Sequence, residues 1–174
     1  MEINIKLDSR SIKMAIRNVK KYQDKINSKC EQVVNRLADI GIETARLNCG
    51  EYGTYITFSK EVKGTATGAN GKIIAVGTPT ERGRNGEYII DPLLMAEFGS
   101  GWKAKVLDKV DGVGQGTFPG QTHAFDPRGW WYSDKDGKSH HSYGEAPTFP
   151  MHSADIAMIM EVNKVLKEVF GNGK

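Results

Sequence analysis

A long apolar repeat begins at Ile12 and ends at Ile40. Its members recur at alternating steps of four and three residues, and Gln23 is the one polar interruption: Ile12, Ile16, Val19, Gln23, Ile26, Cys30, Val33, Leu37 and Ile40. Steps of this size place side chains on one face of an α-helix, whereas a strand would scatter them over two faces. Asp8 or Ser9 offers an N-cap, and segment 48–50 ends the pattern. The repeat therefore predicts a helix of roughly 35 residues, about three times the usual length.

Two properties of this helix stay open. A sustained repeat of 3.5 residues is typical of coiled coils, but the positions that flank the seam carry no ordered charges. We therefore expect the helix to pack across a sheet and to offer a surface to a neighbouring subunit. Gly41 lies inside the repeat, and glycine in a helix interior costs about 1 kcal/mol. A break at Gly41 is thus an alternative to a continuous helix.

The composition indicates one soluble domain, 1–174, because the 174 residues contain no linker-like shift. A formal charge of +3 permits contact with nucleic acid but lacks a concentrated basic face. No apolar run reaches about 18 residues, so no membrane partner is expected. Segment 1–7 alternates apolar and polar residues like a strand and not like a targeting segment. Cys30 and Cys49 are expected to be reduced thiols in the cytosol.

The middle of the chain contains strand-like segments. Segments 54–59 and 72–77 are joined by small residues at 64–71, which predicts an antiparallel hairpin with a flexible tip. A charged turn is expected at 78–86, and a further strand at 88–90.

The last part of the chain predicts a hairpin, an elbow and a helix. Aromatic-bearing segments 129–132 and 139–143 flank a polar turn that contains Asp136-Gly137, a hairpin signal. Pro147 and Pro150 disfavour helix in the residues before them, so Thr148 and Phe149 should be extended. An amphipathic helix then runs from Pro150 to about Phe170, with Gly171 as C-cap. The predicted fold is α+β: a small antiparallel β-sheet packed against a long N-terminal helix and a C-terminal amphipathic helix.

A glycine-rich connection separates these parts at about 99–122, and we expect a flexible loop there. It carries Lys103, Lys105 and Lys109. Its glycine trio, Gly112 to Gly116, is followed by Thr117-Phe118-Pro119 where a phosphate-binding loop would need a helix.

Three kinds of chemistry compete. A metal-dependent hydrolase would draw its ligands from His123, Asp126, His140, His141 and His152, although adjacent histidines on a strand point to opposite faces. A carboxylate pair would come from Glu97, Glu145 and Asp126, but a glutamate that caps a turn or pairs with arginine is the commoner case. A module that binds single-stranded nucleic acid would stack bases on Trp102, Trp130, Trp131, Tyr132 and Tyr143 beside Lys103 and Lys105.

Two motifs change this balance, and the second of them consists of two segments. Leu94-Met-Ala-Glu-Phe-Gly-Ser-Gly101 is followed, after the long loop, by Gly129-Trp-Trp-Tyr132 and Ala146-Pro-Thr-Phe-Pro-Met-His-Ser-Ala154. Together they resemble the tail-completion or head-tail joining (neck) proteins of long-tailed double-stranded DNA bacteriophages and prophages. Ser100 replaces the commoner threonine of that family, and segment 103–122 has no counterpart in it.

The resemblance implies a structural virion protein that assembles as a hexameric ring at the head-tail junction or tail terminus. It implies no catalysis, and no cofactor or metal is expected. Partners would be further copies of the chain and other neck or tail proteins, in the host cytoplasm during assembly and then in the virion. Glu97, Phe98, Gly99 and Gly101 would shape a turn at the sheet end. Trp130, Trp131, Phe149, Pro150 and Met151 would lock the hairpin to the last helix, and the three loop lysines would face DNA in the lumen.

Overall fold

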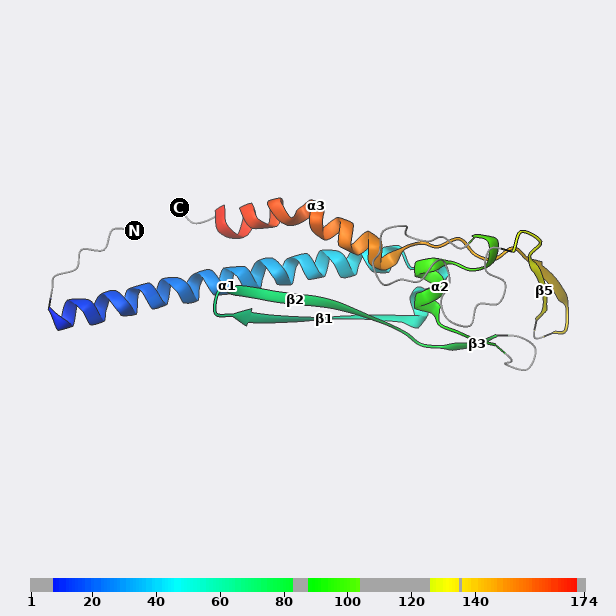
Figure 1. Ribbon diagram of the computed structural model, residues 1–174, viewed down its shortest axis with the longest axis horizontal. Helices are drawn as coiled ribbons and strands as arrows, with labels where there is room; N and C mark the ends of the chain where they lie inside the picture. Colours follow the sequence, from blue (N-terminus) through cyan, green and yellow to red (C-terminus); the bar gives the residue numbers. More distant parts are fainter. Residues whose placement is uncertain (1–7, 83–87, 104–125, 135, 172–174) are drawn as a thin grey trace. The chain divides into compact units, whose positions relative to one another are not determined.

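The computed structural model describes residues 8–82, 88–103, 126–134 and 136–171 (Figure 1). The predicted strand at 1–7 and most of the glycine-rich loop lie outside these ranges. Within them the α+β class is confirmed. Helix α1 spans Ser9–Leu47, α2 spans Pro92–Phe98 and α3 spans Pro150–Gly171, and three antiparallel sheets of two strands each complete this part of the chain.

The chain divides into two compact units. The first comprises 1–39, 60–72 and 160–174, and the second comprises 40–59 and 73–159. Helices α1 and α3 and strands β1 (Ile56–Thr65) and β2 (Gly68–Gly77) each have residues in both units. The prediction of one domain over 1–174 stays a prediction.

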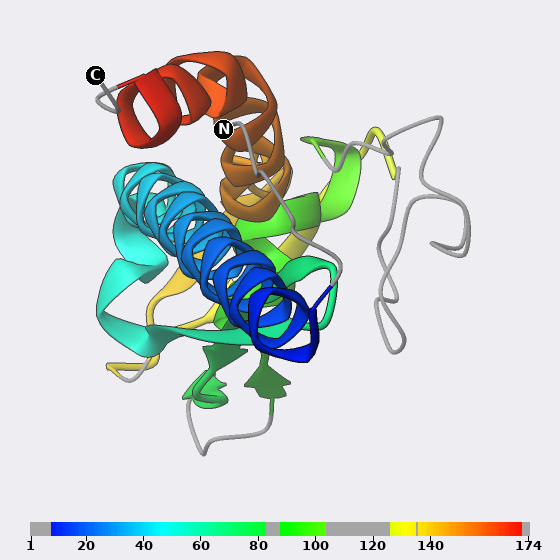
Figure 2. The same ribbon diagram turned by 90° about the vertical axis from the view of Figure 1, so that its left-hand side faces the viewer.

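In the first unit, side chains of α1 bind both the hairpin tip and the last turns of α3. Gln23 donates to the carbonyl of Ala66 at 3.0 Å, so the polar interruption of the repeat marks the contact with the tip. Arg36 pairs with Glu168 of α3. The last turns of α3 accordingly lie alongside α1 in both views (Figures 1 and 2).

The second unit contains the principal apolar core. It combines the residues just after α1, the 3₁₀ turn Gly50–Tyr55, the start of β1 and helix α2 through Cys49, Tyr52, Ile56, Met95 and Ala96. Helix α1 is continuous through Gly41, which settles the alternative left open above. A Cβ at this position would lie 2.5 Å from Ile73 Cδ1 and 3.0 Å from Met158 Sδ. Glycine is therefore present because β2 and α3 approach the helix closely there.

The central hairpin is longer than expected. Only Ala66 and Thr67 separate β1 from β2, so the prediction of a turn over 64–71 is wrong. Gly64 and Gly71 lie in the strands, where an added Cβ would overlap Glu31 and Val34 of α1, respectively. These glycines permit a close approach of strand to helix and do not make a turn.

The expected charged turn at 78–86 is also partly wrong, because Thr80–Arg82 forms β3. This strand pairs antiparallel with β4 (Tyr88–Ile90), with Thr80 opposite Ile90. A strand of three residues is too short to show the apolar alternation by which strands are predicted, which needs about four to eight residues.

The predicted aromatic hairpin is confirmed. Strands β5 (Trp130–Ser133) and β6 (Ser139–Ser142) pair antiparallel with Trp131 opposite His141. Gly137 has φ +79° in the turn between them. The positive φ at this glycine is the geometry that the Asp-Gly signal predicts.

Helix α3 begins at Pro150, as predicted, but Phe149 before it is not extended. Its φ is +54°, which is uncommon for a residue other than glycine. The amides of Thr148 and Phe149 both donate to the carbonyl of Ala96, at 2.8 and 3.1 Å, and the Phe149 carbonyl accepts from Ser153. These bonds to α2 and to the first turn of α3 override the local preference of a residue that precedes proline.

Candidate functional site

The two segments that carry the family resemblance lie against each other in the second unit. We call residues 96–101 and 144–152 together the junction. The Ser100 amide donates to the Glu145 carbonyl at 2.8 Å, and the Glu145 amide donates to Ser100 Oγ at 3.0 Å. With the two bonds to Ala96, they join segments that lie more than 40 residues apart in the sequence.

Glu97 caps the start of α3. Its carboxylate accepts from the Met151 amide at 2.8 Å and from the His152 amide at 3.1 Å, and the residue is only 9% exposed. Amides in the first turn of a helix lack partners within the helix, and negative charge there is favourable. Glu97 and Phe98 belong to α2, so the turn of Gly99 to Gly101 follows a helix and not a sheet end. Glu97 is thus a capping glutamate.

Three glycines with positive φ shape the junction: Gly99 at +69°, Gly101 at +58° and Gly144 at +91°. A Cβ on Gly101 would overlap the ring of Trp130, which places that ring directly on the turn. Gly99, Ser100 and Gly101 are buried. The start of the segment predicted as a flexible loop is therefore packed, and that part of the prediction is wrong.

Trp130 and Trp131 lie on opposite sides of the hairpin. Trp130 is partly buried against Gly101, whereas Trp131 is 71% exposed. Phe149 contacts His152, their rings 6.3 Å apart, and Pro150 is buried at the start of α3. Of the two tryptophans expected to lock the hairpin to α3, the structure places only Trp130 against the junction.

The outward side of the hairpin carries a cluster that we call the aromatic face: Trp131, His141 and Tyr143. The ring centroids of Trp131 and His141 lie 4.9 Å apart, and those of His141 and Tyr143 lie 4.7 Å apart, edge to face. His141 Nε2 is 2.9 Å from the Arg128 carbonyl, which fixes the central ring. Tyr143 is 50% exposed. The cluster is thus held in place with two large aromatic side chains open to solvent.

Sequence reasoning grouped Tyr143 with Trp131 only as part of a platform for stacking bases, together with residues from the other side of the hairpin, and considered His141 only as a metal ligand. The signal was present, because strand pairing places residue 131 opposite 141 and alternation places 143 on the same side. What the sequence alone does not give is which side of the hairpin faces outward.

The candidate metal ligands that the structure describes bind other protein groups. His140 Nε2 lies 2.6 Å from Asp134 on the side opposite His141, and this hydrogen bond, with those from backbone amides, lowers the pKa of Asp134. Asp126 pairs with Arg128, its Oδ1 3.1 Å from Nε. No group of three or more histidine, cysteine or acidic side chains within the described ranges could hold a metal ion. His123 lies outside them.

The possible DNA-facing lysines are mostly outside the described residues too. Lys103 ends the 3₁₀ turn Gly101–Lys103 and is exposed beside Trp102, which is 55% exposed. Lys105 and Lys109 lie in the segment that is not described. Among the helices that the structure describes, none is long and apolar enough to cross a membrane.

Glu145 connects the junction to the core. The Tyr52 hydroxyl donates to Glu145 Oε2. Burial raises the pKa of Glu145 above its ordinary value, and the charge of Glu51 raises it further. The junction therefore contains an acid whose neutral form the fold favours.

We expect Glu145→Gln to stabilise the protein at pH 7 and to flatten the pH dependence of its unfolding free energy. A carboxyl group whose pKa is raised on folding stabilises the fold fully below its unfolded pKa, and this contribution is lost as the pH rises through the folded pKa. Glutamine stays neutral and keeps an oxygen that accepts from Tyr52. Urea unfolding of both proteins between about pH 3.5 and 7.5 measures the difference. Two parallel pH profiles would contradict the prediction.

No protein-family model, no curated protein and no solved structure matches this chain.

Proposed function

We propose that this chain is a structural assembly protein of a bacteriophage or prophage, which forms a ring at the head-tail junction or tail terminus and works by binding without catalysis. The sequence resemblance supplies the family. The junction supports it, because the two segments that carry the resemblance bond to each other as one structural piece.

The aromatic face is the single observation that carries the proposal. Trp131 is 71% exposed although the hairpin beneath it is fixed through Trp130 and Gly101. Tryptophan and tyrosine are enriched where proteins bind each other, since they bury a large area at little cost in side-chain entropy. A ring needs one patch on each subunit that meets a different patch on the next until the rotation closes. The aromatic face fits one half of such a contact.

Replacing Trp131 by alanine is expected to weaken ring formation by about 2 kcal/mol, or roughly thirtyfold in the association constant. Tyr132→Ala is the matched control, because Tyr132 is 44% exposed but lies on the opposite side of the hairpin. Electron microscopy and native mass spectrometry would count rings formed by the chain alone and with the phage connector or tail tube as template. The proposal would be contradicted if both variants lost rings equally. It would also be contradicted if the wild-type protein formed no rings either alone or with the template.

Other neck or tail proteins would occupy the two open faces of the ring, in the host cytoplasm during assembly and afterwards in the virion. Neighbouring genes for portal and tail-tube proteins would support this role. Contact of Lys103, Lys105 and Lys109 with DNA in the lumen stays part of the proposal. This contact is tested by replacing the three lysines with glutamate and measuring how well the assembled virions retain DNA.

A further inference from the structure

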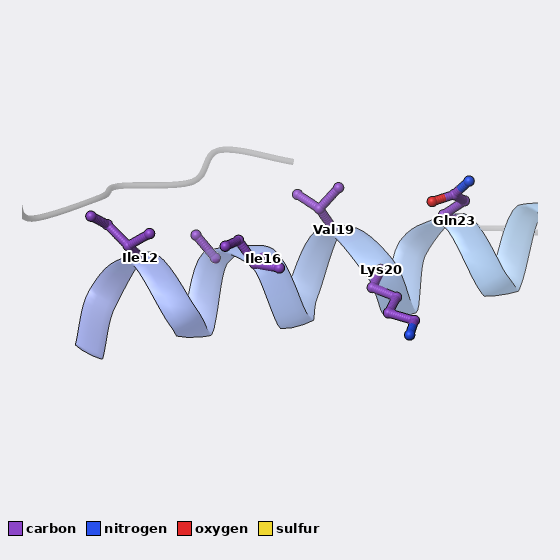
Figure 3. A pocket seen from close by; sticks show the side chains of 6 residues that line it. Ile12, Ile16, Val19, Lys20 and Gln23 are labelled. Atoms are coloured by element: carbon purple, nitrogen blue, oxygen red, sulfur yellow. The ribbon is translucent and has the colours of Figure 1, made fainter. Parts of the chain in front are cut away.

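The first half of α1 carries two parallel rows of side chains that are exposed to solvent. The apolar row contains Ile12, Ile16 and Val19, which are 41%, 65% and 53% exposed. It lines a shallow hollow on the helix surface together with Ala15, Lys20 and Gln23 (Figure 3). The polar end of the hollow, Gln23, is the residue that binds the hairpin tip. The row is thus a helix face that this part of the structure leaves uncovered.

A basic row runs beside it. Arg10, Lys13, Arg17 and Lys20 recur at steps of three, four and three residues, so they lie along one flank of the apolar row. All four side chains are exposed, and none forms an ion pair within the ranges that the structure describes. Over 9–25 the helix holds six basic residues and one acidic residue, Asp24.

We infer that this α1 surface binds an acidic amphipathic helix of a partner protein. An amphipathic helix owes most of its stability to packing of its apolar face. A partner helix with an apolar ridge would cover Ile12, Ile16 and Val19, and carboxylates along one of its edges would neutralise the basic row. This surface is separate from the aromatic face and does not depend on ring formation.

A second copy of the same surface satisfies these features less well. Antiparallel pairing of two such helices would set Lys13 and Lys20 of one copy among the same lysines of the other. Parallel pairing offers one carboxylate, that of Asp8, but this carboxylate already accepts from the amides of Arg10 and Ser11, at 2.9 and 2.8 Å. Neither arrangement neutralises the basic row.

Nucleic acid and lipid fit less well for different reasons. Phosphates would neutralise the basic row but leave the apolar row in water. Helices that lie on anionic membranes place tryptophan, phenylalanine and leucine on their apolar face. Here the row contains β-branched isoleucine and valine, which are typical of a seam between helices.

The test uses the full-length protein and a labelled synthetic helix of about four heptads, with leucine and isoleucine on its seam and glutamate along both edges. Fluorescence anisotropy should give a dissociation constant that rises at least tenfold for Ile16→Asp and about tenfold for Lys20→Glu. Lys25→Glu is the matched control, because Lys25 lies on the opposite side of α1 and carries the same exposed charge. Circular dichroism confirms that each variant keeps its helix content.

Three results would overturn the inference. The first is equal weakening by Lys20→Glu and Lys25→Glu. The second is equal affinity for a peptide with lysine in place of glutamate. The third is an Ile16→Asp variant that binds the acidic peptide as tightly as wild type but loses a different interaction. That interaction would be self-association in sedimentation, binding to phosphatidylglycerol vesicles or binding to duplex DNA.

Discussion

Gly144→Ala is expected to destabilise the protein by about 3 kcal/mol or more, a loss on the scale of a fully disrupted core position. Gly144 has φ +91°, a conformation that a residue with a Cβ rarely adopts. The added Cβ would also overlap the Ser100 carbonyl oxygen and lie 2.5 Å from its carbon. The obstacle is backbone that Glu145 holds with two hydrogen bonds, so it cannot move aside as a side chain would.

Gly171→Ala is the matched control. Gly171 is the last residue of α3, and a Cβ there would meet no atom within 4 Å. Its replacement should change the unfolding free energy by less than about 0.5 kcal/mol, because a surface position without strain tolerates substitution. Urea unfolding gives both values, and hydrogen exchange at the amides of Ser100 and Thr148 reports the junction itself. A Gly144→Ala protein as stable as wild type would disprove the packing of the junction.

The features predicted correctly from the sequence are those that a short window encodes. The 3.5-residue repeat fixes α1 because each step constrains only the next turn, and Asp136-Gly137 fixes the hairpin turn because the required φ is local. Pro150 marks the start of α3 for the same reason, since its ring suits the first helical position.

The errors share a different origin, contact between segments far apart in the sequence. Gly64 and Gly71 look like turn residues, but both lie in strands beside α1, and a Cβ at Gly71 would lie 2.4 Å from Val34 Cγ1. Phe149 should be extended by the rule for residues before proline, yet two amides bind the Ala96 carbonyl more than 50 residues away. Likewise, Trp131 faces outward because Gly101 accepts the ring of Trp130, which no local pattern reveals.

In the candidate site, too, local features were predicted from the sequence and contacts between distant segments were not. The resemblance identified both segments of the junction, but not that Glu97 of one caps the helix that begins in the other. The candidate carboxylates and histidines suggested chemistry because their types are reactive. In the described ranges, however, the carboxylates accept from amides, a hydroxyl and a guanidinium, whereas His140 binds Asp134 and His141 binds the Arg128 carbonyl. These contacts stabilise the fold.

Glu97→Ala is expected to cost about 2 to 4 kcal/mol, because it leaves the amides of Met151 and His152 without an acceptor at a partly buried helix start. Glu97→Gln should cost roughly half as much, since the amide oxygen accepts from one N–H while its NH₂ group meets the other. Hydrogen exchange at Met151 and His152 should accelerate in both variants, in the same order as the loss of stability measured in urea.

Glu161→Ala is the matched control on the same helix. Glu161 forms a surface pair with Lys164 at 2.9 Å, and such pairs contribute about 0.5 kcal/mol or less. A loss in Glu97→Ala no larger than in Glu161→Ala would contradict the capping role. The sign of the effect also separates structure from chemistry. A carboxylate kept for acid-base catalysis commonly destabilises its fold, so its removal would raise the unfolding free energy. Removal of a buried cap must lower it, and the two hydrogen bonds from α3 require that replacing Glu97 lower the unfolding free energy.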